Sequence, residues 1–249
     1  AKAQLSKDQF DQEYECSFEA AILGAFYGTE MREATEQGRI CQVDYQPEVK
    51  VNTAWDLGYR DDTAIWFYQV IRGEIHVIDY FAVSGANISE LAAVITGKPY
   101  KYGKHYLPHD AKAKTLAAQG KSIIEQMAEY LGINNLAIVP DLSVQDGIQA
   151  VRQMLPNTWF HVEHCAEGIE ALRQYQREFD EDKKAFRQTP RHDWCSHPAD
   201  AMRMLAVAWR AEPTVKPPDV VKPLMVGPEN TVTLNDMWAT AKPNRSGRL

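Results

Sequence analysis

The stretch VKVNTAWDLGYRDDTAIWFYQVIRGEIHVIDYFAV, residues 49–83, decides the fold class of this chain. Alternate positions at its start share one parity, which is typical of a strand: Val49, Val51, Thr53, Trp55 and Leu57. The segments 63–71 and 74–83 are rich in β-branched and aromatic residues, and turn-forming residues precede both. The sequence therefore predicts three antiparallel strands joined as a meander.

After residue 83 the pattern changes to an alternation of helices and short strands. Strands are predicted at 105–109, 136–139 and 159–162, and a polar hairpin at 178–191. Helices are predicted at 88–96, 112–131, 143–155, 166–177 and 198–209. A meander followed by β-α units predicts an α/β fold with a mixed sheet flanked by helices.

The two ends of the chain differ from this middle part. Residues 1–45 are predicted to be mostly helical, with Gly38 as a stop signal. Residues 212–249 are rich in proline and have no sustained period, which predicts an extended or disordered tail. A folded domain at 46–211 is expected between them, because a chain with 45% hydrophobic residues can bury a core without staples.

The composition indicates neither a membrane protein nor an oxidising compartment. No apolar run reaches the roughly 18 residues that would suggest a membrane span. The four cysteines form no C-x-x-C motif, and with the nearby histidines they match no zinc-site spacing. A reduced, intracellular compartment is therefore expected.

Charge is distributed unevenly along the chain. The net charge of −7 argues against nucleic-acid binding by the whole surface. Between residues 97 and 121, however, basic side chains surround a single acid, Asp110: Lys98, Lys101, Lys104, His105, His109, Lys112, Lys114 and Lys121. This stretch is either a solvated lysine-rich surface or a patch that binds a phosphodiester backbone.

Three aspartates stand out by their positions. Asp56 lies near the end of the first predicted strand, and Asp110 directly follows the strand HYLPH. Asp200 heads an apolar helix face that includes Met204 and Val207. Three converging carboxylates would repel one another unless divalent cations neutralised them, and carboxylates prefer hard cations such as Mg²⁺ or Mn²⁺.

Each aspartate also has a simpler interpretation. Asp56 fits a turn before Gly58, Asp110 fits a helix N-cap, and Asp200 fits a first-turn partner of the helix dipole. Spacing alone does not show that the three acids meet.

Three motifs carry a resemblance to a known family: WDLGYRDDTAIW (55–66), LPHDAKAK (107–114) and HDWCSHPADAMRMLA (192–206). Together they resemble the nuclease domain of phage terminase large subunits, from about residue 49 to 210. The segment FDQEYECSF (10–18) is similar to the connection between that family's ATPase motor and its nuclease. The resemblance implies an RNase H-like fold, two divalent cations and cleavage of DNA.

The ATPase motor itself is expected outside this chain. Its phosphate-binding loop requires G-x-x-x-x-G-K-[ST], and Thr115 stands where the first glycine before Gly120-Lys121-Ser122 should be. Residues 1–45 are accordingly interpreted as a helical linker that follows the motor.

The resemblance also implies roles for single residues. Asp56 would bridge two metal ions, and Asp110 and Asp200 would each bind one of them. His197, one turn before Asp200, is a candidate partner that orients a carboxylate or a metal-bound water. The DNA backbone would be followed by Lys98, Lys101, Lys104, Lys112 and Lys114.

Two of these roles depend on geometry that the sequence leaves open. If the loop between the first two strands has three residues (59–61), Asp62 lies on the face of Asp56 and is an auxiliary acid. If the loop has four residues, Asp62 lies on the opposite face, because strand side chains alternate. Asp193 shares a motif with Asp200, but it precedes Pro198 outside the regular helix. Asp200 is predicted as the ligand because the helix dipole helps keep it ionised.

The implied setting is the packaging of a viral genome in the host cytoplasm. The partners would be concatemeric double-stranded DNA, the ATPase motor domain, the terminase small subunit and the capsid portal, with no membrane. Two other hypotheses remain. A junction resolvase or transposase would prefer branched DNA or transfer strands, and a silent docking module would bind DNA without binding metal.

Overall fold

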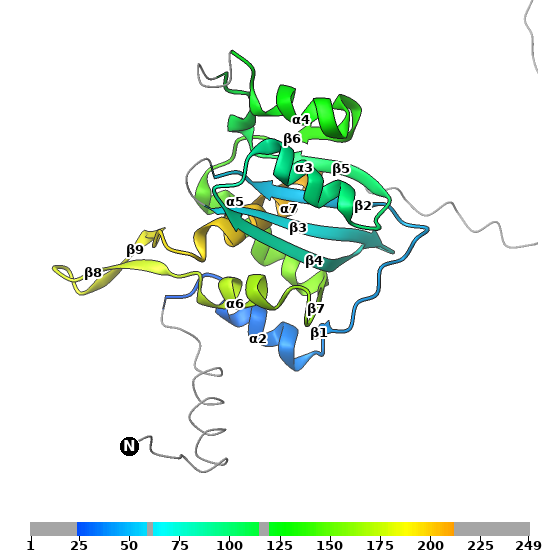
Figure 1. Cartoon of the computed structure of the whole chain (residues 1–249). Helices are drawn as coiled ribbons and strands as arrows, with labels where there is room; N and C mark the ends of the chain where they lie inside the picture. The colour runs from blue at the N-terminus through cyan, green and yellow to red at the C-terminus, as the bar shows by residue number, and fades with distance from the viewer. Residues whose placement is uncertain (1–23, 59–61, 115–119, 212–249) are drawn as a thin grey trace, which may run out of the picture. The chain divides into compact units, whose positions relative to one another are not determined.

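The computed structural model describes residues 24–58, 62–114 and 120–211 (Figure 1). The chain divides into two compact units, Ala1–Pro213 and Thr214–Leu249, and all described residues lie in the first. The strands are β1 (Ile40–Cys41), β2 (Val51–Asp56), β3 (Asp62–Ile71), β4 (Glu74–Ser84), β5 (Tyr102–Leu107), β6 (Leu136–Ile138), β7 (Thr158–His161), β8 (Arg177–Asp180) and β9 (Ala185–Pro190). The helices are α2 (Gly28–Glu36), α3 (Ile88–Gly97), α4 (Ile123–Leu131), α5 (Val144–Met154), α6 (Ala166–Gln174) and α7 (Ser196–Ala211).

One mixed sheet organises the described residues. Its strand order is β1-β7-β4-β3-β2-β5-β6, and β8 and β9 form a separate hairpin. The strands β2, β3 and β4 pair antiparallel, whereas β5 and β6 continue the sheet in parallel on one side and β7 and β1 on the other. The predicted meander and the mixed sheet flanked by helices are therefore confirmed.

The sheet separates two hydrophobic cores. Along β2 and β3, Ala54, Ala64 and Trp66 face a core built with α2, α5, α6 and α7. The intervening residues, among them Trp55 and Ile65, face a second core built with α3 and α4. Figure 1 shows α3 and α4 on one side of the sheet and α2 and α6 on the other. The alternation that predicts β2 thus also divides its side chains between two helical layers.

The N-terminal part of the folded unit departs from the prediction. Only α2 is helical in the described part of 1–45, and residues 40–41 form the edge strand β1. Met31 and Ala34 are buried in the core, and Arg39 donates hydrogen bonds to the carbonyls of Leu155 (2.7 Å) and Thr158 (2.9 Å). The compact unit therefore begins before residue 46. The sequence did not predict this, because a two-residue parallel strand leaves no recognisable pattern. Residues 1–23 lie outside the described part, and the linker role stays a prediction.

The stretch 102–131 requires a second correction. The strand predicted at 105–109 is β5 at 102–107, and a short 3-10 helix, η1 (His109–Lys112), follows it. The helix predicted at 112–131 begins only at Ile123, where Ser122 and Glu125 form a capping box after Gly120, which has a φ of +80°. The continuous apolar pattern hid this N-terminal signal. Residues 115–119 lie outside the described part.

The remaining elements lie close to their predicted positions. The hairpin predicted at 178–191 is β8-β9, and the last helix is α7, which begins two residues before the predicted start. In the part of the chain that the structure describes, no helix is both long enough and apolar enough to cross a membrane.

Candidate active site

Asp56 is the last residue of β2 and lies on the face of the sheet that α7 covers. It shares this face with Ala54 and pairs across the ladder with Ala64 of β3. Its Oδ2 atom lies 2.8 Å from Nδ1 of His197, in the first turn of α7, and 21% of its side chain remains exposed. This hydrogen bond is the largest contribution that raises the pKa of His197, which favours an ion pair.

Asp200 follows His197 by one turn of the same helix. Trp66 of β3 anchors this turn to the sheet, because its indole N–H donates to the carbonyl of Pro198 (2.8 Å). Burial raises the pKa of Asp200, and the negative charge of Asp56 raises it further, while Arg203 and His197 lower it. The two carboxylates are therefore within electrostatic reach of each other at the end of β2.

Asp62 lies on the same face as Asp56. The register pairs Asp56 with Ala64, so Asp62 stands two residues along β3 from the partner of Asp56. Extending this register would pair Gly58 with Asp62, which is the geometry of the three-residue loop; residues 59–61 themselves lie outside the described part. The charge of Asp62 also contributes to the raised pKa of His197. A fourth charged group thus belongs to the same neighbourhood.

Asp110 lies beyond the same edge of the sheet but is not joined to the other acids. It belongs to η1, which begins two residues after β5, and β5 runs parallel to β2 with Ala54 opposite Tyr106. Within the described ranges, Asp110 has no hydrogen bond or ion pair with Asp56 or Asp200. The helix-cap interpretation of Asp110 is wrong, since Pro108 precedes η1 and Ser122 caps α4.

Asp193 has a local role in the turn before α7. Its carboxylate accepts a hydrogen bond from the Cys195 N–H (3.0 Å) and lies 3.5 Å from Arg191. Its N–H donates to Ser196 Oγ (3.0 Å). These contacts stabilise the approach to α7, whereas Asp200 is the acid of this motif whose pKa the charge of Asp56 raises.

The chemistry of this neighbourhood fits a hard divalent cation. Asp56 and Asp200 offer carboxylate oxygens, and their mutual repulsion would be relieved by a positive charge between them. Across residues 24–58, 62–114 and 120–211, no group of three or more His, Cys, Asp or Glu side chains is arranged to hold a metal ion as it stands. Asp56 and Asp200 are therefore the two acids of the candidate centre.

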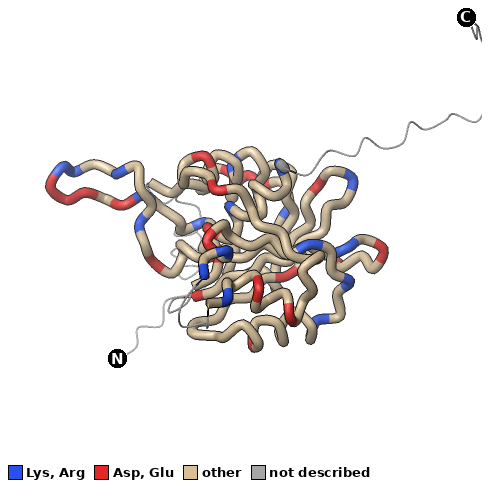
Figure 2. The backbone as a smooth tube through the Cα atoms, turned by 90° about the horizontal axis from the view of Figure 1, so that it is seen from above, with Lys and Arg blue, Asp and Glu red and all other residues tan. Residues whose placement is uncertain are grey.

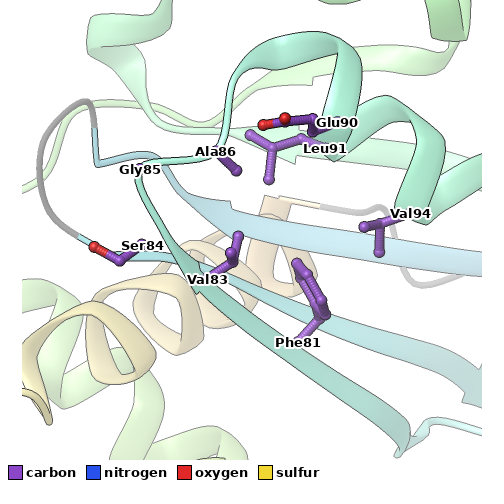
Figure 3. Close-up of a pocket in the computed structure, with 8 residues that line it drawn as sticks. All are labelled: Phe81, Val83, Ser84, Gly85, Ala86, Glu90, Leu91 and Val94. Atoms are coloured by element: carbon purple, nitrogen blue, oxygen red, sulfur yellow. The ribbon is translucent and has the colours of Figure 1, made fainter.

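A pocket on the opposite face of the sheet is not part of this site. It measures about 290 Å³, lies between the end of β4 and α3, and is lined largely by apolar side chains such as Phe81 and Leu91 (Figure 3). Its acid, Glu90, closes the capping box of α3 by accepting from the Asn87 N–H (2.9 Å). The pocket thus holds no free carboxylate for metal chemistry.

Comparison with known proteins identifies the family. The model of the terminase RNase H-like domain matches residues 53–208, more than half of the chain. The chain belongs to this family. The predicted resemblance to terminase nuclease domains and the RNase H-like fold class are confirmed, whereas no curated protein matches the sequence.

Solved terminase structures share the fold of this terminase domain. A large terminase from a thermophilic bacteriophage superposes with a TM-score of 0.55 at 16% identity, over 82% of this chain and 52% of that one. The large terminase nuclease from the thermophilic phage G20c has a TM-score of 0.51 with bound cobalt and with bound magnesium, at 16% and 15% identity, over 76% of this chain and 97% of that one. The terminase domain therefore spans about half the length of the first of these proteins.

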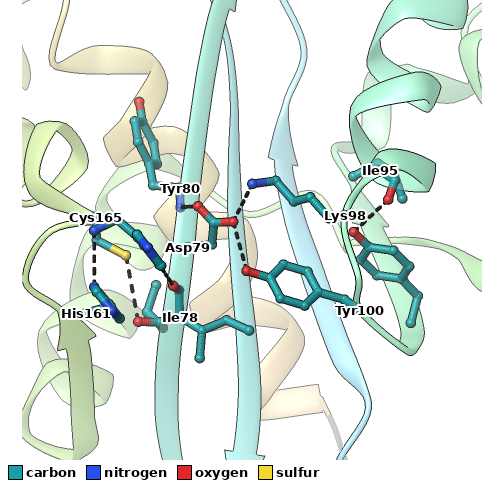
Figure 4. A network of polar contacts seen from close by, with 11 residues as sticks. Ile78, Asp79, Tyr80, Ile95, Lys98, Tyr100, His161 and Cys165 are labelled. Atoms are coloured by element: carbon teal, nitrogen blue, oxygen red, sulfur yellow. Dashed lines mark hydrogen bonds and ion pairs between the residues drawn. The ribbon is translucent and has the colours of Figure 1, made fainter. Parts of the chain in front are cut away.

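The basic residues predicted to bind DNA have different surroundings in the terminase domain. The Lys98 ammonium forms an ion pair with Asp79 (Figure 4). It lies 5.0 Å from the centre of the Phe67 ring, which belongs to the core on the α3 face of the sheet, opposite the face of Asp56. Lys104 donates to the Asn134 carbonyl (2.6 Å), and Lys114 lies 3.8 Å from Glu125. Figure 2 likewise shows Lys and Arg dispersed among acids. Of these lysines, Lys98 has the surroundings that argue most strongly against contact with DNA. Lys101 and Lys112, by contrast, are exposed to solvent.

Arg203 is the site residue that the sequence analysis missed. Its Nε and Nη2 atoms lie 3.0 and 2.7 Å from Oδ1 of Asp200, and only 12% of its side chain is exposed. The available signal was the spacing, because an acid and an arginine three residues apart share one side of a helix. In sequence this pair looks like an ordinary surface ion pair.

Proposed function

We propose that this terminase domain is a metal-dependent endonuclease that cuts concatemeric viral double-stranded DNA during genome packaging. The observation that carries the proposal is the convergence of Asp56, Asp200 and His197 at the end of β2, in a chain of the terminase RNase H-like family. Half-buried acids held near one another are costly to a fold and are characteristic of functional sites. Magnesium and cobalt bound to the related G20c nuclease support the choice of a divalent cation.

The acids at the end of β2 would hold the cations. We assign Asp56 as the ligand common to two ions, with Asp200 and Asp110 as ligands of one ion each and Asp62 as an auxiliary acid. Bound Mg²⁺ or Mn²⁺ would supply charge to the scissile phosphate and to the attacking water. The assignment of Asp110 is supported by its position after β5, which runs parallel to β2, so that Asp110 follows the same end of the sheet as Asp56.

His197 would orient Asp56 rather than bind an ion itself. It is fixed by α7 and its Nδ1 atom contacts Oδ2 of Asp56, which leaves Oδ1 as the other oxygen available to a ligand. An oxygen-rich site for Mg²⁺ has no need of imidazole, and a hydrogen bond to a ligating carboxylate fixes its direction.

The DNA and the packaging machine would contact the domain around this edge. Lys101, Lys104, Lys112 and Lys114 remain the candidates for sequence-independent contacts to the phosphate backbone. The ATPase motor, the terminase small subunit and the capsid portal are the proposed protein partners. The segments at 1–23 and 212–249, which the structure does not describe, are the proposed connections.

The test is plasmid nicking in the presence of Mg²⁺, Mn²⁺ or EDTA, with Asp56→Ala as the inactive variant. Asp44→Ala is the control, because Asp44 is an exposed acid outside this neighbourhood that accepts a hydrogen bond from Gln42 (3.1 Å). We expect nicking that EDTA abolishes and that Asp44→Ala retains. DNA binding without metal-dependent nicking would instead support a docking module, and a preference for branched DNA would support a resolvase.

A further inference from the structure

We propose that Arg203 is a positioning residue of this nuclease site, which holds one oxygen of Asp200 so that the other is presented toward Asp56. The inference rests on the proposed function, since it assigns Asp200 as a ligand of the cation. It adds a residue that contacts neither the cation nor the DNA and acts only through Asp200.

The contact geometry sets the direction of the Asp200 carboxylate. The two closest contacts of the guanidinium, from Nε (3.0 Å) and from Nη2 (2.7 Å), both reach Oδ1. Two donors from one planar group restrict the rotation of the carboxylate more than a single point charge would. Oδ2 is thereby left as the oxygen for a ligand, while 30% of the Asp200 side chain stays open to solvent.

The surroundings of Arg203 hold it in place. Gly147 of α5 lies so close that a Cβ atom there would stand 3.0 Å from Cδ of Arg203. The rings of Tyr27 and Tyr175, which stack with their centroids 5.6 Å apart, are also close enough to Arg203 to influence it electrostatically. A guanidinium enclosed in this way provides a rigid support for a ligand, which is what a metal site needs from the residues behind its ligands.

Repulsion between Asp56 and Asp200 is the reason that Asp200 needs a residue to hold its orientation. With a negative charge at Asp56 nearby, an unsupported Asp200 would gain by rotating away toward solvent. Arg203 opposes this rotation by holding Oδ1. Lysine could supply the charge but not both contacts, so charge and position are separable by substitution.

A second, partly buried ion pair provides a matched control. Arg152 of α5 contacts Glu30 of α2 through Nε, at 2.9 Å, and joins two helices rather than a helix and the site. Removing Arg152 therefore breaks an ion pair of the same kind and leaves the contacts of Asp200 unchanged. A merely structural role for Arg203 predicts that the two arginines behave alike.

The experiment measures the response of the full chain to Mn²⁺ in wild type, Arg203→Lys, Arg203→Met and Arg152→Met. The readouts are the Mn²⁺ concentration for half-maximal nicking, the KM for plasmid, and the rise in melting temperature that Mn²⁺ causes. We expect Arg203→Lys to raise the half-maximal Mn²⁺ concentration on the order of 10-fold and to shrink the melting shift, with KM for DNA unchanged. Arg152→Met should lower the melting temperature and leave the Mn²⁺ response as in wild type.

The outcomes separate this inference from the proposed function. If wild type nicks DNA with Mn²⁺ and Arg203→Lys needs no more Mn²⁺ than wild type, the inference about Arg203 is overturned and the function stands. If wild type shows neither metal-dependent nicking nor a melting shift, both fall. Arg203→Lys keeps the test decisive if Arg203→Met does not fold, because it retains the charge beside Asp200.

Discussion

The two faces of the central sheet each carry acids beside a basic partner, but they differ in how completely those acids are satisfied. On the α3 face, Asp79 accepts hydrogen bonds from the Tyr80 N–H (2.9 Å) and the Tyr100 hydroxyl (3.0 Å) and pairs with Lys98 (Figure 4). Its side chain is only 11% exposed. On the α7 face, Asp56 and Asp200 are more exposed and repel each other.

The difference shows which acids are available for chemistry. Each oxygen of Asp79 already has a donor, so a cation would have to displace Lys98. Asp56 and Asp200 are each held through one oxygen, by His197 and Arg203 respectively. A charge that is fully paired inside the protein supports the fold, whereas two half-satisfied charges at the end of a strand are characteristic of a functional site.

The largest expected effect is the loss of nicking in Asp56→Ala. Removing the proposed common ligand should lower the rate on the order of 100- to 1000-fold or more, the scale for losing an electrostatic stabiliser of the transition state. The metal-free protein should lose little stability, because the repulsion with Asp200 is relieved. Nicking assays and thermal melting check both parts, and wild-type rates in a folded variant would break the contrast between the two faces.

Within the motif HDWCSHPADAMRMLA (192–206), Asp200→Asn and Asp193→Asn should differ by about 100-fold in Mn²⁺-dependent nicking. The charge of Asp56 raises the pKa of Asp200. Asp193 instead accepts a hydrogen bond from the Cys195 N–H in a turn, and an asparagine side chain can still accept it. The measurement is the initial nicking rate at saturating Mn²⁺. A dead Asp193 variant beside a fully active Asp200 variant would reverse the assignment.

On the α3 face, His105 should make stability depend on pH. Burial lowers the pKa of His105 to about 4, and Nδ1 lies 2.7 Å from the Thr53 hydroxyl. As the pH falls, His105 is protonated in the unfolded chain before it is protonated in the folded protein. Its contribution to the free energy of unfolding is therefore fully present above pH 6.5 and is lost as the pH drops toward 4, by about 3 kcal/mol. Urea unfolding of wild type and His105→Gln between pH 7 and 4 should show this loss only in wild type.

Asp79→Ala should have the opposite signature to Asp56→Ala. It leaves the Lys98 ammonium without its carboxylate and should destabilise the fold by about 2 kcal/mol, less than for a fully buried pair because Lys98 is partly exposed. Nicking per folded molecule should stay within about 2-fold, since Asp79 faces the other core. Denaturant titration gives the stability. A large drop in the rate of the folded variant would link the two faces.

The smallest effect is expected from removing the tail. Truncation after Glu212 should leave plasmid nicking unchanged, because residues 213–249 are rich in proline and lack the periodicity of a core element. Portal or motor binding, measured by co-sedimentation, is where the loss should appear. An insoluble or inactive truncated protein would show that the tail supports the domain.

Local patterns in the sequence determined the elements, the family and the candidate acids. Alternation in residues 49–57 and β-branched runs at 63–71 and 74–83 predict β2, β3 and β4, because strand side chains repeat every two residues. The predicted element boundaries were wrong in two places. β1 has only two residues, too few for a strand pattern, and the apolar run before Leu131 concealed the N-terminus of α4.

Only the tertiary structure decided which charges meet. Asp56 and Asp200 lie far apart in the chain, and they approach because α7 packs across β2 and Trp66 ties the first turn of α7 to the sheet. Lys98, at the end of α3, reaches Asp79 on the other face of the sheet, and Arg203 packs against Gly147 of α5 behind Asp200. Periodicity records which way a side chain points from its own element, whereas the distance between two charges depends on how whole elements pack over the core, and no local pattern contains that information.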